Sequence, residues 1–419
     1  MRYLVSASQV LTGPAGQRVD GGAVLVEGES IVAVGLLDEV RAAAGADTME
    51  LAFPSATILP GLINAHVHLA FNVGPDRLEN LIAPADPARL ALAMAGRAQQ
   101  LLHCGVTTVR DLGDRGGLTV ELREAINAGD LAGPRILAAT APLTPPGGHC
   151  WFLGGEVDGP DQIREQIQRN AAAGADVIKV MVSGGSMTPG GAAMWQPQFH
   201  TDQLRTVVDE ARRLGLPVAA HAHGTSSIRT CVDAGVDTIE HCTWLTGPGV
   251  FEPDEQTVAD LVTAGIAVCP ANSNNWRPFA NKYGAQRAQQ IIGRVRWMAD
   301  RGVRLITGTD AGMAPFDTFP AALRALEDWG FTREQILEMA TVTTADALGL
   351  ATTAGTLHAG YSADLLVVDG DPLADLAALQ RPTLVIARGR RTFPAFRDRA
   401  DPAGTRLPPA ALRDGAVGH

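Results

Sequence analysis

The sequence predicts an α/β fold, a (β/α)8 TIM barrel with a small β-sandwich domain built from both chain ends. Short apolar runs alternate with amphipathic stretches through the middle of the chain, which is the pattern of βαβ units around a parallel sheet. The apolar runs number eight, which favours a closed barrel over an open doubly wound sheet. Each end of the chain carries further strand-like runs, but neither end has enough of them to bury a core alone.

The strand-like runs at the two ends predict the sandwich. Residues 22–26 and 31–34 are apolar and flank the turn-like run Glu27-Gly28-Glu29-Ser30, so they predict a hairpin. A matching run, residues 363–368, precedes the turn at 369–372. A chain of 419 residues suits one barrel of about 250 residues plus a satellite. The expected domains are the composite sandwich of residues 1–57 plus 351–419 and the barrel of residues 58–350.

Each of the eight apolar runs is expected to form one barrel strand. They are residues 58–68, 106–111, 135–139, 176–182, 217–223, 238–241, 266–270 and 304–310. Helix-like segments such as 163–173 and 202–214 separate most of these runs. The active site of such a barrel lies at the carboxyl ends of its strands, so the ends of the runs are where chemistry is expected.

Composition excludes several classes of protein. Hydrophobic residues make up 46% and charged residues 19%, which is enough for a large core and argues against a disordered chain. A net charge of -11 argues against a nucleic-acid binder. We find no signal peptide and no run of roughly 20 apolar residues, so no membrane association is expected. The five cysteines are scattered without a CxxC pair, which favours a reducing cytoplasm. We expect a small-molecule substrate and a homo-oligomer.

Groups that bind metals gather at the ends of the expected strands. They are His66 and His68 on the first run, Lys179 on the fourth, His221 and His223 on the fifth, His241 on the sixth and Asp310 on the eighth. His66 and His68 share one face of a strand, because alternate side chains point the same way. Two imidazoles at that spacing can bind one divalent cation through their nitrogen atoms. Any one of these residues could be an ordinary hydrogen-bonded side chain, but the set at one rim is not expected by chance.

Several motifs resemble those of a known family. They are residues 60–68 (PGLINAHVH), 105–111 (GVTTVRD), 221–224 (HAHG), 239–241 (IEH), 308–312 (GTDAG), 345–350 (ADALGL) and 360–365 (GYSADL). In this order they are similar to the amidohydrolase superfamily over about residues 1–395. The run 174–180 (GADVIKV) resembles the branch whose lysine is carboxylated by CO2. Within the superfamily the chain is similar to imidazolonepropionase-like and prolidase members, the latter being Xaa-Pro or carboxypeptidase-type dipeptidases.

The resemblance implies a binuclear metal centre and a hydrolytic mechanism. The implied ligands are His66, His68 and Asp310 on one ion, His221 and His241 on the other, and the CO2-derived carbamate of Lys179 between them. Two divalent ions, zinc by default, fit these nitrogen and oxygen ligands, although manganese, cobalt or iron would also fit. A metal-bridging hydroxide would attack the substrate carbonyl. Asp310 would take its proton and pass it to the leaving nitrogen.

Two further histidines are expected to bind the substrate rather than the metals. His223 lies two residues beyond His221 and faces the same mouth, so we assign it to a substrate carbonyl or carboxylate. His149 lies in the run Pro145-Pro146-Gly147-Gly148-His149-Cys150 and resembles a substrate-contacting loop histidine of dipeptidase-like members. His200 opens an expected helix and is interpreted as structural.

The expected reaction is cleavage of an amide or peptide-type C–N bond in a dipeptide or N-acyl amino acid. Four tryptophans follow expected strands and suggest a pocket for a bulky apolar or aromatic group; they are Trp151, Trp195, Trp244 and Trp276. Arg277 and Arg115 are candidates for binding a substrate carboxylate.

Other functions remain open at this point. Hydrolysis of a cyclic amide or carbamate, or a lyase reaction on the same metals, fits the same ligands. A mononuclear deaminase is disfavoured, because these enzymes place a glutamate where this chain has Gly224. A non-catalytic scaffold would be expected to have lost ligands, and every implied ligand is present. The number of bound metal ions separates these classes: about two for the binuclear hydrolase, one for a deaminase and none for a scaffold.

Overall fold

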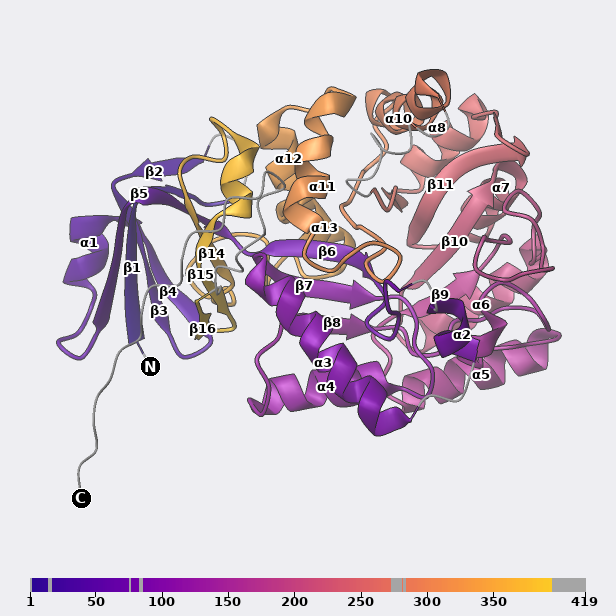
Figure 1. The fold of residues 1–419 in the computed structure, drawn as a ribbon, viewed down its shortest axis with the longest axis horizontal. Coiled ribbons are helices and arrows are strands. Elements are labelled where there is room, and N and C mark those ends of the chain that lie inside the picture. The colour runs from indigo at the N-terminus through magenta and orange to yellow at the C-terminus, as the bar shows by residue number, and fades with distance from the viewer. Residues whose placement is uncertain are drawn as a thin grey trace.

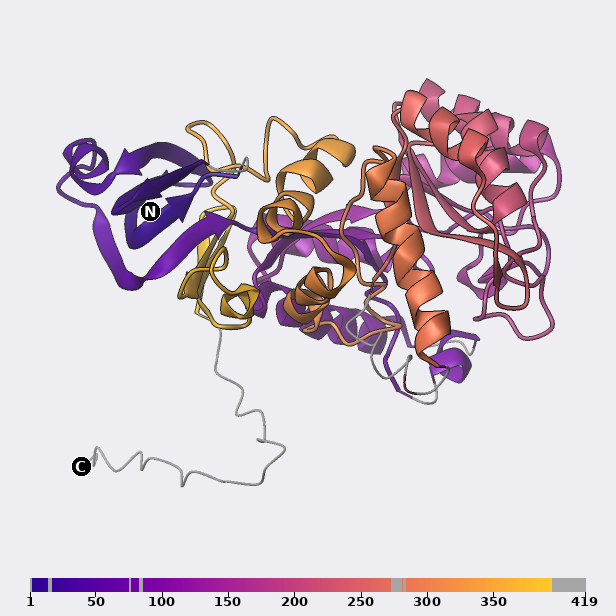
Figure 2. The same ribbon diagram turned by 90° about the horizontal axis from the view of Figure 1, so that it is seen from above.

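A computed structural model of the chain describes residues 2–13, 17–74, 77–82, 86–272, 281 and 284–393. A sheet formed by the two ends of the chain lies beside a larger body of strands and helices (Figures 1 and 2). No helix in these ranges is both long and apolar enough to cross a membrane.

The end sheet has eight strands drawn from both ends of the chain. In order across the sheet they are β16 (Arg390–Thr392), β15 (Pro382–Ala387), β14 (Leu365–Asp369), β5 (Met49–Pro60), β1 (Arg2–Leu11), β3 (Gly22–Glu27) and β4 (Ser30–Leu36), with β2 (Arg18–Asp20) paired to β1. The expected hairpin is β3–β4, in which Val24 pairs with Val34. Strand β5 runs parallel to β1 and antiparallel to β14, so it joins the two ends of the chain. Helix α1 (Leu37–Ala42) contacts β3 and β4.

The larger body contains two parallel groups of strands. One group is β6 (Leu62–Val67), β7 (Val106–Asp111) and β8 (Arg135–Ala138). The other is β9 (Ile178–Met181), β10 (Val218–Gly224), β11 (Thr238–Gly247) and β13 (Ala267–Cys269), with the short β12 (Val250–Phe251) antiparallel to β11. Six of the expected runs therefore contain one strand each.

The first expected run, residues 58–68, belongs to two strands rather than one. Strand β5 ends at Pro60 in the end sheet, and β6 begins at Leu62 in the larger body. A Cβ atom on Gly61 would lie 2.0 Å from Thr107 Oγ1, so only glycine lets the chain pass this closely to β7. The Pro-Gly pair therefore marks the crossing between the two parts of the molecule.

The eighth expected run, residues 304–310, does not form a regular strand. Its backbone nevertheless bonds on both sides: Ile306 N–H donates to Val268 O (2.9 Å) in β13, and Asp310 N–H donates to His66 O (2.9 Å) in β6. The pairing is irregular because the side-chain oxygen of Asn64 accepts the N–H groups of His66 (3.3 Å) and Thr309 (3.2 Å), in place of backbone carbonyls.

A second irregular contact links the two groups of strands. Leu143, beyond β8, accepts a hydrogen bond from Met181 N–H (2.9 Å) and donates one to Lys179 O (2.8 Å). Asp176 N–H in the fourth run also donates to Ala138 O (2.8 Å) in the third, so backbone hydrogen bonds connect each of the eight runs to its neighbours on both sides.

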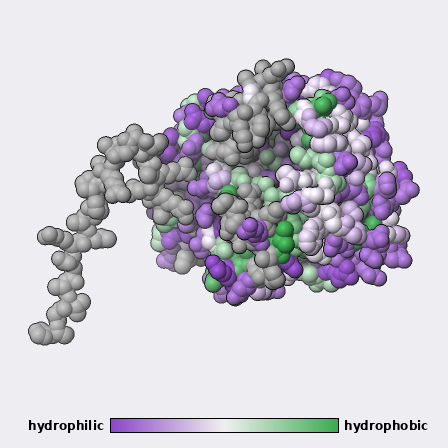
Figure 3. Space-filling view, turned by 45° about the vertical axis from the view of Figure 1, so that its right-hand side comes forward, coloured by the Kyte–Doolittle hydropathy of each residue, from purple (hydrophilic) through white to green (hydrophobic). Residues whose placement is uncertain are grey.

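Helices cover the outside of these strands (Figure 1). They are α2 (Arg77–Ile82), α3 (Pro87–His103), α4 (Leu118–Ala128), α5 (Pro160–Ala172), α6 (Thr201–Arg213), α7 (Thr225–Ala234), α8 (Glu255–Thr263), α10 (Ala285–Asp300), α11 (Phe319–Ala325), α12 (Arg333–Met339) and α13 (Val342–Ala347). Several of them bury one apolar face; α3, for example, buries Met94, Ala98 and Leu101. On the face shown in Figure 3, hydrophilic residues gather toward the edge, with residues of intermediate and apolar character between them. The expected helices at 163–173 and 202–214 correspond to α5 and α6.

Candidate metal centre

Six histidines meet at the carboxyl ends of the strands. His66 is in β6 and His68 follows it, His221 and His223 are in β10, His241 is in β11, and His149 lies in the loop after β8. Ring centroids are 5.0 Å apart for His66 and His241, 4.7 Å for His221 and His241, and 4.7 Å for His149 and His221. The structure thus brings together all six histidines that the sequence singled out as ligands or substrate contacts.

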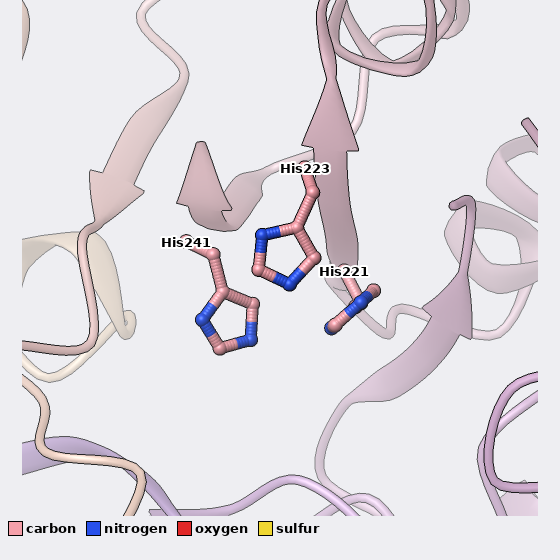
Figure 4. A group of neighbouring side chains, drawn as sticks. All are labelled: His221, His223 and His241. Carbon is pink, nitrogen blue, oxygen red and sulfur yellow. The ribbon is translucent and has the colours of Figure 1, made fainter. Parts of the chain in front are cut away.

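Three of these imidazoles form one compact group (Figure 4). His221, His223 and His241 each offer a ring nitrogen within 4.8 Å of the others. The rings of His223 and His241 are stacked, 4.6 Å apart at 18°. Nδ1 of His223 lies 3.0 Å from Thr243 Oγ1, so its second nitrogen is the one available to a ligand. His223 is therefore as close to the group as the two histidines expected to bind metal.

Asp310 completes a second group with the histidines of the first strand. Its Oδ1 atom lies 3.5 Å from His66 Nε2 and 3.4 Å from His68 Nε2. His66, His241 and Asp310 each offer one possible ligand atom within 4.8 Å of the others. The two groups share His241, so they adjoin.

Lys179 lies in β9 and its side chain is 1% exposed. Burial lowers the pKa of its amine to about 8. An amine with this pKa is partly neutral near pH 7.5, and a neutral amine is the form that reacts with CO2. The chain has only one other lysine, Lys282. Because almost every other basic residue of the chain is an arginine, the presence of a lysine at position 179 itself indicates a special role, and the sequence analysis did not use this signal.

Four buried polar atoms of the expected metal ligands have no hydrogen-bond partner. They are His66 Nε2, His68 Nδ1, Lys179 Nζ and Asp310 Oδ1. Buried polar groups are normally paired, so such a concentration requires an explanation. Burial also lowers the pKa of His66, and it lowers that of His149 to about 4 and of His223 to about 3, so these rings keep their lone pairs at neutral pH. Neutral imidazoles and a carboxylate fit divalent metal ions.

A buried charge network contacts His66 through Nδ1, the ring nitrogen on the side away from Asp310. The Glu240 carboxylate accepts hydrogen bonds from Arg110 Nη2 (2.7 Å) and Thr238 Oγ1 (2.8 Å), and its other oxygen lies 2.8 Å from His66 Nδ1. Although burial raises the pKa of Glu240, Arg110 and His66 hold it below its usual value. The carboxylate therefore fixes a proton on Nδ1 and turns Nε2 of His66 toward Asp310. Sequence reasoning missed Glu240 and Arg110, although both lie inside the quoted motifs.

The backbone is strained at two of the expected ligands. His241 has φ 69° and Asp310 has φ 54°, in the left-handed region that residues other than glycine seldom adopt. Cys242 and Trp244, which follow His241, share this conformation. Such residues cost of order 1–3 kcal/mol each and cluster at functional sites.

His149 is held at the mouth of the site by close packing. It is 5% exposed, its N–H donates to Gln198 Oε1 (2.8 Å), and Nδ1 lies 3.4 Å from Thr188 Oγ1. A Cβ atom on Gly185 would lie 2.3 Å from the His149 ring. Glycine at 185 is therefore what lets the ring lie beside His221.

The expected aromatic pocket is only partly supported. Trp244 is fully buried and donates to Met298 Sδ (3.4 Å), so it belongs to the core under α10, and its assignment to the pocket is wrong. Trp151 is 38% exposed, and Trp195 is half-buried beside Gly224. Trp276 and Arg277 lie outside the described residues. Arg115 is exposed and His200 is the N-cap residue of α6.

Parallel strands whose carboxyl ends carry imidazoles, a carboxylate and a buried lysine define a class of α/β hydrolases. The chain belongs to the amidohydrolase family, whose model matches residues 57–392. An ochratoxinase of Aspergillus niger is 28% identical over 381 residues, covering 80% of this chain and 75% of the relative. An imidazolonepropionase of Symbiobacterium thermophilum is 24% identical over 405 residues, covering 87% of this chain and 90% of the relative. A crystal structure of a Xaa-Pro dipeptidase with bound methionine is 27% identical, with a TM-score of 0.81 over 94% of this chain and 100% of that one.

These similarities confirm the family predicted from the motifs, including its prolidase and imidazolonepropionase-like branch. The protein is a hydrolase acting on C–N bonds. Members of this family act on small molecules and typically use divalent metal ions.

Proposed function

We propose that the enzyme hydrolyses the amide-type C–N bond of a dipeptide or N-acyl amino acid that carries a bulky apolar or aromatic group. The observation that carries this proposal is the convergence of four unpaired buried polar atoms, on His66, His68, Lys179 and Asp310, at the mouth of the strands. The similarity to an ochratoxinase and to a Xaa-Pro dipeptidase supports an amide substrate.

The site is suited to two divalent ions, with zinc the default for nitrogen and oxygen ligands. His66, His68 and Asp310 would hold one ion. His221 and His241 would hold the other, and the carbamate of Lys179 would be a ligand of both ions. When bound, the ions would polarise the substrate carbonyl and lower the pKa of a water molecule toward neutrality.

The chain's own residues then have distinct tasks. Asp310 accepts the proton of the attacking water and returns it to the leaving nitrogen, because Oδ1 has no hydrogen-bond partner that would compete for it. His149 and His223 are neutral, and we assign both rings to contacts with the substrate carbonyl or carboxylate. Glu240 orients His66 and touches no substrate.

The same proposal includes the shape of the scaffold. The hydrogen bonds that link all eight runs support a closed (β/α)8 barrel over residues 58–350. Residues 1–57 and 351–419 would form a small sandwich domain around the end sheet. Its two buried clusters, one containing Val5 and Val367 and one containing Leu4 and Leu25, lie on opposite faces of that sheet and support this division.

Deamination by a mononuclear site is disfavoured by packing as well as by sequence. A Cβ atom on Gly224 would lie 2.5 Å from the carbonyl oxygen of Trp195. A glutamate at this position would therefore require the loop carrying Trp195 to move. A lyase or a cyclic-amide hydrolase remains the second candidate, because it would use the same ligands.

The test begins with metal content and the lysine. Purified enzyme should contain about two divalent ions per chain. Labelling with ¹³C-bicarbonate should give one carbamate signal that disappears in Lys179→Ala and remains in Lys282→Ala, the matched control on the only other lysine.

Hydrolysis is measured on the same three proteins with a panel of dipeptides and N-acyl amino acids. Wild type and the control should cleave aromatic members of the panel, and Lys179→Ala should not. Two bound metals with no hydrolysis of any panel member would overturn the proposed substrate class and favour the second candidate.

A further inference from the structure

Arg294, on α10, is a buried cation that has no ion pair among the residues that the structure describes. Arg294 is only 8% exposed, and the Nε and Nη1 atoms of its guanidinium have no hydrogen-bond partner. Among the ion pairs of the described residues, none includes Arg294. Its guanidinium lies over the ring of Phe251, 5.8 Å from the centroid, which is a cation–π contact.

Arg294 lies beside the part of β11 that follows His241, because Phe251, the ring under its guanidinium, pairs with Leu245 of that strand. After burial and the charge of His149, the charge of Arg294 is the next cause that lowers the pKa of His223. It also lowers the pKa of Cys242, the residue next to His241, which burial raises to about 12. Arg294 is therefore a neighbour of His223, near the end of β10, and of Cys242, next to His241 in β11.

The guanidinium stays charged despite its surroundings. Burial lowers the pKa of Arg294 only to about 10, so the group is a cation at neutral pH. A buried ion without a partner costs several kcal/mol. The other two buried arginines among the described residues have partners within the chain: Arg110 is paired with Glu240, and Arg388 donates hydrogen bonds to Asn127 Oδ1 and Ile126 O.

The surrounding sequence points the same way. Residues 270–299 contain five arginines and lysines and no aspartate or glutamate, in a chain whose net charge is -11. The segment that leads into α10 therefore contains no carboxylate that could pair with Arg294. The missing partner has to come from outside the segment.

We infer that Arg294 binds a carboxylate of the substrate and so selects molecules that carry a free carboxylate beside the scissile amide. This inference rests on the proposed function and deepens it. The planar guanidinium can donate two parallel hydrogen bonds to a carboxylate, through the Nε and Nη1 atoms that the protein leaves unpaired. The aromatic ring of Phe251 behind it keeps water away and strengthens the pair.

The experiment compares two substrates that share the bond to be cleaved. N-acetyl-L-phenylalanine has the carboxylate, and N-acetyl-2-phenylethylamine lacks it. A hydrogen bond to a charged group contributes about 1.5–3 kcal/mol, so wild type should favour the acid by roughly 10- to 100-fold in kcat/KM. Arg294→Met should remove that preference by slowing hydrolysis of the acid alone, and Arg294→Lys should restore part of it.

Arg296→Met is the matched control on the same helix. Arg296 lies over the ring of Phe331 and pairs with Asp300 on the surface, so its loss should leave both substrates unaffected. Thermal unfolding separates binding from folding. Arg294→Met should have a melting temperature at or above that of wild type, because it removes an unpaired buried charge and leaves no partner stranded.

Binding of the product L-phenylalanine to the metal-loaded enzyme gives a readout that does not depend on turnover. Wild type should bind L-phenylalanine more tightly than 2-phenylethylamine, and Arg294→Met should lose this difference. If the enzyme shows this difference in binding but cleaves no panel member, the proposed function would be overturned and the carboxylate site would stand. Hydrolysis with an unchanged acid preference in Arg294→Met would overturn the carboxylate site and leave the function standing.

Discussion

Replacing Glu240 with methionine should weaken both the fold and the metal centre, for two separable reasons. Glu240 is fully buried and offsets the charge of Arg110, which is 3% exposed. Removing one partner of a buried ion pair costs about 3–5 kcal/mol, because the other charge is left unpaired. The same change removes the acceptor of His66 Nδ1, and the loss of such a partner lowers metal affinity by about 10- to 100-fold.

A second variant separates the two effects. In Glu240→Met/Arg110→Met the stranded charge is gone, so most of the lost stability should return, since a neutral pair of similar size often replaces a buried ion pair without cost. Metal affinity should stay low, because His66 still lacks its acceptor. The surface pair of Glu255 and Arg301 is the control: although its shortest N–O distance is 2.5 Å, Glu255→Met should cost at most about 1 kcal/mol.

Stability is measured by urea denaturation of the metal-free protein, and affinity by competition with a chromophoric chelator. Wild-type metal affinity in Glu240→Met would show that Glu240 does not orient His66. A double variant as unstable as the single one would show that the charge of Arg110 is not the source of the cost.

The remaining predictions concern glycine and tryptophan positions. Gly96→Ala, in the interior of α3 with open space around it, should raise the unfolding free energy by about 0.5–1 kcal/mol in urea denaturation. Gly185→Ala should displace His149 and lower kcat/KM by roughly 100-fold while metal content by mass spectrometry stays unchanged; full activity would refute a role for that ring. Trp244→Ala should cost about 3–5 kcal/mol without altering the preference for aromatic substrates, whereas Trp195→Ala should alter that preference at unchanged stability.

The convergence of the ligand residues was predictable because it depends on simple periodicity. His66 and His68, like His221 and His223, are two residues apart on a strand, and parallel strands bring their carboxyl ends to one edge. Six of the eight runs also contain a strand where the sequence expects one, because continuous apolar runs between amphipathic helices have few other ways to be buried.

The parts that sequence reasoning missed depend on side chains that replace the regular pattern. The sequence of residues 304–310 predicts a strand. In the structure, however, Asn64 Oδ1 accepts backbone N–H groups that would donate to backbone carbonyls in a regular strand pairing. Glu240 and Arg110 pair across the interior from strands far apart in the sequence, and no local pattern indicates which charges will meet. Trp244 lies beyond the end of the run expected from the sequence, but β11 continues to Gly247 through a left-handed backbone at His241 and Cys242, and Trp244 donates to Met298 of α10.

Lys179 and Arg294 are both buried and form no ion pair among the described residues, but the chain treats the two charges differently, and the difference indicates what each one binds. Lys179 lies among Glu240, Arg110 and Asp310 with its pKa lowered to about 8, so it can lose its proton and change its chemistry. Arg294 keeps its charge, because a guanidinium cannot be neutralised within the physiological range. A group that can become neutral can be converted into a ligand by CO2, whereas a group that stays cationic requires an anion from outside the chain. The lysine therefore fits the proposed metal centre, and the arginine fits the proposed site for the substrate carboxylate.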